Sequence, residues 1–144
     1  MGFKKYLIEN NVRFEYVDGE DNEFEDYDGI DNVAKKSGIN ILRGKDANMV
    51  AIVDDQVVGV LFTEFDGQEY SFDVAVLPEF QNMGIGKRLT DMGISEYHQY
   101  EDMGDITMRL DVVNPKMVKL LQSKGLVVTD QQGGHVMMEY PKHH

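Results

Sequence analysis

The chain has 144 residues, which suits one domain with a single core, and its apolar fraction of 42% is sufficient to build that core. A net charge of −12 argues against nucleic acid and anionic membranes as partners, because both attract clustered Lys and Arg. The absence of cysteine excludes disulfides, thiolate metal sites and cysteine nucleophiles. Apolar runs are shorter than the roughly twenty residues of a membrane-spanning helix, and no signal peptide is evident, so we expect a cytoplasmic protein.

The predicted elements are strands in the first part of the chain and alternating helices and strands in the second. In chain order we expect a helix or strand at 3–9, a strand at 12–17, a helix at 30–36, strands at 49–53, 57–64 and 70–77, a helix at 86–102, a strand at 106–113, a helix at 115–124, and a last strand pair at 126–129 and 135–140 around Gln131 to Gly134. This order predicts an α/β (α+β) fold with a mixed, largely antiparallel central sheet flanked by helices.

The most informative segment joins the strand at 70–77 to the helix at 86–102. Pro78 ends the strand, and Gly84 and Gly86 permit backbone conformations that a Cβ would resist. The main-chain amides from about residue 83 to 87 then form the first turn of the helix, where free N–H groups and the helix dipole favour an anion. Lys87 and Arg88 add positive charge, so the segment predicts a phosphate-binding turn.

Two other glycine-rich phosphate loops do not fit these residues. A dinucleotide-binding loop needs a third glycine where Leu89 stands. A P-loop needs glycine at Gln81 and Ser or Thr at Arg88.

The helix at 115–124 has clear start and stop signals. Asn114 is a good N-cap, and Pro115 suits the first helical position. Lys124 complements the C-terminal end of the helix dipole, and Gly125 is suited to the C′ position.

These two blocks resemble the GNAT superfamily of N-acetyltransferases. The pattern Gln81-x-x-Gly84-x-Gly86, after an apolar strand and Pro78, resembles the acetyl-CoA pyrophosphate loop of that family. The block that begins at Asn114 is similar to the family's fifth strand and fourth helix, matched here at Asn114, Leu120, Gly125 and, loosely, Leu126, and the two blocks together cover residues 70–128.

The resemblance implies one GNAT-like domain over residues 1–144, with a splayed strand pair and a pyrophosphate-binding helix N-terminus. Within that domain we expect a divergent acidic segment at 1–45 and an acyl-CoA-binding core at 46–144. The implied co-substrate is acetyl-CoA, no metal is expected, and main-chain groups on the strand before the loop are expected to line the pantetheine and thioester. The expected cofactor-binding residues are Val74, Ala75, Val76, Asn82, Met83, Gly84, Ile85, Gly86, Lys87 and Asn114.

Amide formation from a thioester needs a neutral amine and a route for the proton that the attacking nitrogen releases. Asp111 is our first candidate for that proton, because it occupies a strand position where some ribosomal-protein N-terminal acetyltransferases have a catalytic Glu, although the following connection is two residues shorter here. Asp73 is the second candidate, and Glu69 begins the same strand. We expect His98 and His135 to be structural or surface residues, the latter in a hairpin turn beside Gly133 and Gly134.

The sequence departs from the family at the general acid. Leu121 stands where many members place the tyrosine that is thought to protonate the departing thiolate of CoA. Tyr97, Tyr100, Tyr140 or water are the alternatives, since a thiolate with a pKa of about 8.5 is a tolerable leaving group.

An acidic segment from Glu15 to Asp31 is the strongest compositional bias. It carries nine acids and no Lys or Arg, which would attract a cationic amine if the segment borders the acceptor groove, as the family's N-terminal helices usually do. The alternative is a solvated loop that aids solubility. Calcium is rejected, because Phe24 and Lys35 stand at ligand positions of the EF-hand pattern.

We therefore expect an N-acetyltransferase that acts on a primary amine, which is a small cationic amine, a lysine or a protein N-terminus. The alternative is a catalytically weak CoA-binding or protein-interaction module with the same fold, and a plain acidic binding domain is the third reading. Pairing of an edge strand between two copies leaves a homodimer open.

Overall fold

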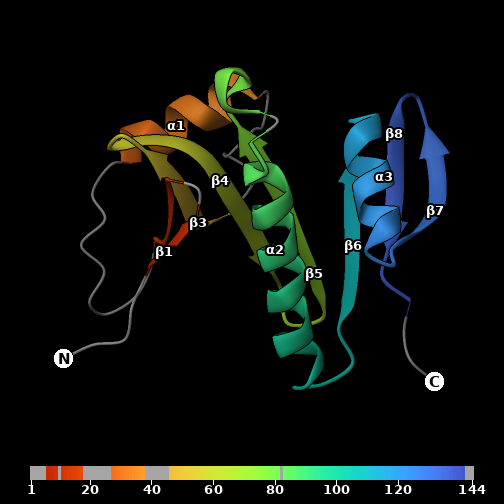
Figure 1. Cartoon of the computed structure of the whole chain (residues 1–144). Coiled ribbons are helices and arrows are strands. Elements are labelled where there is room, and N and C mark those ends of the chain that lie inside the picture. The colour runs from red at the N-terminus through yellow and green to blue at the C-terminus, as the bar shows by residue number, and fades with distance from the viewer. Residues whose placement is uncertain (1–5, 10, 18–26, 38–45, 82, 142–144) are drawn as a thin grey trace. The chain divides into compact units, whose positions relative to one another are not determined.

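The computed structural model describes residues 6–9, 11–17, 27–37, 46–81 and 83–141 (Figure 1). It divides into two compact units, residues 1–64 with 72–93 and residues 65–71 with 94–144. The hydrogen-bonded strand order is β1-β2-β3-β4-β5-β6-β8-β7. The sheet is mixed and mostly antiparallel, so the fold class predicted from the sequence is confirmed.

Antiparallel strands dominate the first unit. They are β1 (Tyr6–Glu9), β2 (Val12–Tyr16), β3 (Asp46–Val53) and β4 (Gln56–Phe65), followed by β5 (Glu69–Val76), which contributes residues to both units. The β3–β4 hairpin turns at Asp54 and Asp55, whose φ values of 49° and 64° are those of the two-residue turn that matches strand twist. A continuous buried stretch follows, because every residue from Val57 to Phe62 is buried.

Helix α2 (Ile85–Glu101) approaches this sheet closely, and two glycines permit the approach. A Cβ on Gly59 would lie 3.0 Å from Ile85 Cγ2 and 3.2 Å from Leu89 Cδ1. A Cβ on Gly93 would lie 2.8 Å from the ring of Phe72. The N-terminal part of α2 is therefore fixed against β4 and β5 by contacts that leave no room for a side chain at either glycine.

The other helix of the first unit is α1 (Tyr27–Lys36). It buries Ile30, Val33 and Ala34, which recur at helical spacing, and exposes Asp28 and Asp31. Most of the acidic segment, residues 18–26, lies outside the described residues, so its placement stays a prediction.

The second unit contains β6 (Thr107–Val112), β7 (Val127–Gln132), β8 (His135–Glu139) and α3 (Pro115–Ser123), which packs against β6 and β7 (Figure 1). The parallel pairing of β5 and β6 joins Glu69 to Thr107 and Tyr70 to Met108. β6 pairs with β8, and β8 pairs with β7, both antiparallel. Met108, Leu110 and Val112 point to the buried face of β6, so Arg109 and Asp111 share the exposed face.

Several predicted boundaries need correction. The strand expected to end at Leu77 ends at Val76, because Pro78 opens a short 3-10 turn, although Leu77 itself is buried. The four-residue turn expected at 131–134 has only two residues, since Gly133 and Gly134 both have positive φ and keep Gln132 paired with His135. Residues 3–9, expected as helix or strand, include the strand β1, and residues 3–5 lie outside the described ranges. No helix in the described part of the chain is long and apolar enough to cross a membrane.

Candidate functional site

Strand β5 is irregular where the cofactor is expected. Tyr70 and Phe72 are buried, but the next buried residue is Ala75, so the alternation slips by one position at Asp73 and Val74. An extra residue in a strand has this effect, and it leaves both Asp73 and Val74 half-buried. Val76 is half-buried between the buried Ala75 and Leu77, so the alternation resumes after the slip.

A compact connection follows β5. The Leu77 N–H donates to the carbonyl of Val58 at 2.8 Å, and a 3-10 turn, η2 (Pro78–Phe80), reverses the chain. The Gln81 side chain then reaches back, with Nε2 donating to the carbonyl of Val76 at 3.3 Å. These bonds fix both ends of η2, so the glycine turn begins from a defined position.

The glycine turn leads directly into α2. Gly84 has a φ of +82° and a Cβ there would meet nothing within 4 Å, so its conformation, not lack of space, requires glycine. The Arg88 N–H donates to the Gly84 carbonyl at 3.0 Å at the start of the helix. The N–H groups of Ile85, Gly86 and Lys87 precede that bond and have no acceptor within the helix.

This first turn therefore has the geometry and electrostatics of an anion site. Lys87 and Gly84 are exposed, Met83 is 45% exposed, and Ile85 is buried and anchors the turn. The helix dipole and the Lys87 ammonium both favour negative charge there. Among the predicted cofactor residues, Asn82 lies outside the described residues.

Asn114 caps α3 as predicted. Its Oδ1 accepts a hydrogen bond from the Lys116 N–H at 2.9 Å. At the other end, the Leu126 N–H donates to Leu121 O and the Gly125 N–H to Gln122 O, with a φ of +102° at Gly125. These are the two bonds of a Schellman motif, so both ends of this helix follow from local sequence signals.

Asp111 makes a contact that the sequence did not predict. Its Oδ1 and Oδ2 lie 3.0 Å and 3.2 Å from Nδ1 of His135, and the two side chains are 54% and 60% exposed. Asp111 lies on β6 opposite Met137 of β8, two positions from His135 on the same face. The prediction that His135 is only a turn residue was incomplete, because it opens β8 and faces the first candidate for the proton.

A second ionic group lies on the same face of β6. The Arg109 guanidinium contacts Glu69 of β5 at 3.4 Å and Glu139 of β8 at 3.6 Å. Glu69, the third carboxylate considered from the sequence, is thus paired with a cation. Arg109 is therefore held by these two acids, whereas Asp111 contacts Nδ1 of His135.

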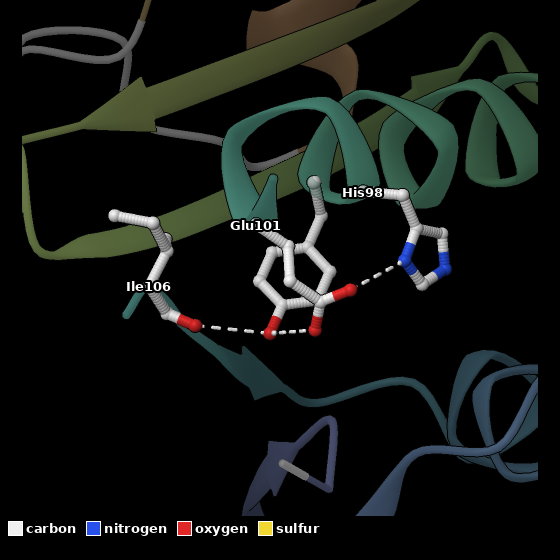
Figure 2. Close-up of polar contacts among 4 residues, drawn as sticks. His98, Glu101 and Ile106 are labelled. Atoms are coloured by element: carbon white, nitrogen blue, oxygen red, sulfur yellow. Dashed lines mark hydrogen bonds and ion pairs between the residues drawn. The ribbon is translucent and has the colours of Figure 1, made fainter. Parts of the chain in front are cut away.

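Two of the three tyrosines considered as general acids have hydroxyls that are already engaged. Tyr97 is fully buried, and its hydroxyl faces two acceptors, Ile106 O at 3.0 Å and Glu101 Oε2 at 3.2 Å. Figure 2 shows the chain of contacts from Ile106 to Glu101 and on to His98, whose Nδ1 lies 3.2 Å from Glu101 Oε1. Burial, followed by the charge of Glu101, raises the pKa of Tyr97 to about 12. Its proton is thus committed to a structural contact.

The other two tyrosines belong to the same aromatic cluster. The Tyr100 hydroxyl is 3.5 Å from Glu96 Oε1, and burial raises the pKa of Tyr100. Tyr140 packs edge-on against His98 at a ring-centroid distance of 5.2 Å. Leu121, at the position of the usual general acid, is buried and supplies no proton.

Within the described ranges, no group of three or more His, Asp or Glu side chains could hold a metal ion.

Comparison with known proteins identifies the fold that contains the β5–α2 connection and Asp111. A sequence model described as an acetyltransferase (GNAT) domain matches residues 45–125, which is more than half of the chain. The match includes the β5–α2 connection, Asp111 and the capped helix α3. No curated protein sequence matches at a significant level.

Solved structures agree with this match. The NatC complex bound to Gag peptide and CoA aligns with a TM-score of 0.69 at 14% identity, covering 92% of this chain and 99% of that one. The ribosomal-protein-S18-alanine N-acetyltransferase from Escherichia coli aligns with a TM-score of 0.65 at 16% identity, covering 90% and 93%. The PaiA N-acetyltransferase from Thermoplasma acidophilum, in complex with coenzyme A, aligns with a TM-score of 0.53 at 21% identity, covering 76% of this chain and 66% of that one.

Proposed function

Because the chain belongs to the GNAT acetyltransferase family, we propose that it transfers an acetyl group from acetyl-CoA to a primary amine by direct attack on the thioester. The observation that carries this proposal is the β5–α2 connection. Gly84 in the left-handed region, followed by the N–H groups of Ile85 to Lys87, supplies donors and positive charge for a pyrophosphate. Solved relatives of the same fold that contain CoA or acetyl-CoA support the choice of anion.

Acetyl-CoA in this proposal lies along the end of β5. The pyrophosphate binds to the turn at Met83 to Lys87, and the thioester lies beside Val74, Ala75 and Val76. The slip in the burial pattern of β5 supports this role, because it lies at Asp73 and Val74, directly where the thioester is proposed to bind. A main-chain N–H there would polarise the thioester carbonyl, as oxyanion-hole donors do. Asn82 and Asn114 complete the proposed cofactor contacts.

The chemical step needs the amine as a neutral nucleophile. Its lone pair attacks the carbonyl carbon, the C–S bond breaks, and the nitrogen loses a proton while the thiolate gains one. Asp111 and Asp73 are the carboxylates we assign to the proton leaving nitrogen. Because Leu121 supplies no proton and the hydroxyls of Tyr97 and Tyr100 are engaged, Tyr140 or water protonates the thiolate, which is a tolerable leaving group with a pKa of about 8.5.

The acceptor class is a small cationic amine, a lysine side chain or a protein N-terminus. The net charge of −12 supports a cationic acceptor, because a strongly acidic protein attracts cations at long range. The turn at Lys87 carries positive charge although the chain as a whole is acidic. A polyanion such as CoA would be held at this turn.

A second candidate is a CoA-binding module that has little catalysis. The buried Leu121 favours it, because the position of the family's usual proton donor carries a side chain that cannot donate. Binding of acetyl-CoA is common to both candidates, whereas turnover belongs only to the first.

The discriminating experiment is a thiol-release assay with the full chain and acetyl-CoA. Spermidine, a lysine-containing peptide and an unblocked basic peptide serve as acceptors, and the hydrolysis rate without acceptor is subtracted. The proposal expects thiol release that depends on at least one acceptor, with acetylated product found by mass spectrometry. Binding of acetyl-CoA without product from any of the three would favour the binding module.

A further inference from the structure

Thr90 lies one turn into α2, directly behind the first-turn amides of the proposed cofactor site. Its side chain is fully buried, and among the described residues it is the only buried polar side chain apart from tyrosines. The Thr90 hydroxyl donates a hydrogen bond to the Gly86 carbonyl at 2.7 Å. A threonine Oγ1 on a helix can reach the carbonyl one turn back, so this bond follows from local geometry, and burial of Thr90 strengthens it.

The bond to Gly86 also acts on the amide of Lys87. The Gly86 carbonyl and the Lys87 N–H belong to one planar peptide group and point in opposite directions. A hydroxyl that holds the carbonyl toward the body of the helix therefore holds the Lys87 N–H toward the open N-terminal end. Lys87 is exposed at that end, where the pyrophosphate is proposed to bind.

Gly86 is the residue of this turn that side-chain packing restrains least. It has no side chain, and an added Cβ would lie 3.7 Å from Val76 Cγ2, which is an ordinary contact. Ile85 before it and Leu89 after it are buried in the core. A glycine loses more backbone freedom on folding than any other residue, so a second bond to its carbonyl fixes the peptide that the core does not hold.

The same bond strengthens the Lys87 N–H as a donor. Hydrogen bonds in series polarise one another, so a peptide whose carbonyl accepts a hydroxyl has a more positive N–H. The Ile85 N–H differs, because it shares its peptide with the Gly84 carbonyl, which accepts the N–H of Arg88. Thr90 therefore acts on one donor of the first turn and leaves the Ile85 donor unchanged.

We propose that Thr90 is a positioning residue for acetyl-CoA, which orients and polarises the Lys87 N–H toward the pyrophosphate through the Gly86 carbonyl. The inference rests on the proposed binding of acetyl-CoA at this turn. The residues it uses, from Gly84 to Thr90, belong to one compact unit. No covalent bond changes in this role, so its effect is on the affinity for the cofactor.

The first test compares amide proton shifts of the free protein by NMR. Thr90→Val keeps the branched shape and removes the hydroxyl, whereas Thr90→Ser keeps the hydroxyl. The Lys87 amide proton should move upfield in Thr90→Val and stay near its wild-type position in Thr90→Ser. The Ile85 amide proton is the internal control and should move in neither variant. A Lys87 amide that moves no more than that of Ile85 would overturn the proposal.

The second test is titration with two ligands. Acetyl-CoA carries the pyrophosphate, and S-acetylpantetheine is the same thioester arm without it. Thr90→Val should bind acetyl-CoA roughly 5-fold more weakly than the wild type, which is the effect of one ordinary hydrogen bond, and Thr90→Ser should bind it like the wild type. The affinity for S-acetylpantetheine should not change in either variant. Equal weakening of both ligands would indicate a general distortion and contradict the positioning role.

Thr63→Val is the matched control, because it makes the same substitution on β4 of the same unit, where Thr63 pairs with Asp46. Its affinity for both ligands should stay within about 2-fold of the wild type. If Thr90→Val bound acetyl-CoA as tightly as this control, Thr90 would have no positioning role. Wild-type protein that does not bind acetyl-CoA would instead contradict the proposed function, so the two failures are distinguishable.

Discussion

The β5–α2 connection and the Asp111–His135 pair are built in opposite ways. The first lies in one continuous stretch, residues 77–87, in which a proline and two glycines set main-chain geometry. The second joins side chains 24 residues apart through the register of β6 and β8. The difference teaches that a turn defined by main-chain geometry is visible in a short sequence, whereas a contact between two side chains from different strands depends on strand register.

The packing of α2 against β5, which supports the first region, can be broken by adding a side chain where the two elements touch. Gly93→Val places a Cβ 2.8 Å from the Phe72 ring, closer than real Cβ atoms come, so the helix or the ring must move. We expect a loss of about 1–3 kcal/mol in the free energy of unfolding, measured in urea, since overpacking typically costs that much. The small gain in helix propensity over glycine does not offset it.

Ser95→Val is the control, because it adds the same side chain to an exposed position of the same helix. Its effect should stay within about 0.5 kcal/mol, as for most surface substitutions. Equal stability of the two variants would show that α2 is not fixed against Phe72 in the way described.

The same difference between local signals and strand register decides which features could be predicted from the sequence. Caps, hairpins and the glycine turn were predicted because Asn114, Gly125 and Gly84 act on their own neighbourhood. His135 was missed because its partner depends on the pairing of β8 with β6, although the alternation His135, Met137, Glu139 was a usable signal for the face that it shares with Asp111. The slip in β5 at Asp73 was also out of reach, since it depends on packing.

Tertiary contacts also determine which tyrosine hydroxyls are engaged in structural hydrogen bonds. Tyr97 could be placed on a helix from its spacing, but its bond to Ile106 O depends on how the chain returns after α2. A buried hydroxyl with that contact is structural, so the list of general acids could be shortened only with the structure.

The smallest expected effect on stability comes from Asp66, in the turn before β5. This turn leads into Glu69, which contacts Arg109 on the same face of β6 as Asp111. Asp66 Oδ1 accepts from the N–H groups of Glu69 at 2.7 Å and Gln68 at 2.9 Å, and these bonds lower the pKa of Asp66. A lowered folded-state pKa stabilises the fold above the unfolded value of about 3.9, and that stabilisation is lost as pH falls through the folded-state pKa.

Urea unfolding at pH 7 and at pH 2.5 measures this contribution. Between the two pH values, Asp66→Asn should lose less stability than the wild type, because the variant has no carboxylate to protonate. Asp102→Asn makes the same charge change in the exposed turn after α2 and controls for net charge. If both variants lost the same amount, the two bonds to Asp66 would contribute nothing specific.

The central claim is that the first turn of α2 binds the pyrophosphate of acetyl-CoA, and titration calorimetry tests it most directly. The wild type should bind acetyl-CoA, and Gly84→Glu, which puts a carboxylate beside the first-turn amides, should weaken binding at least about 100-fold, or roughly 2.7 kcal/mol. Gly67→Glu is matched in charge, exposure and positive φ, at +97° against +82°, and should bind like the wild type. Equal affinity of the two variants, or no binding by the wild type, would contradict the account.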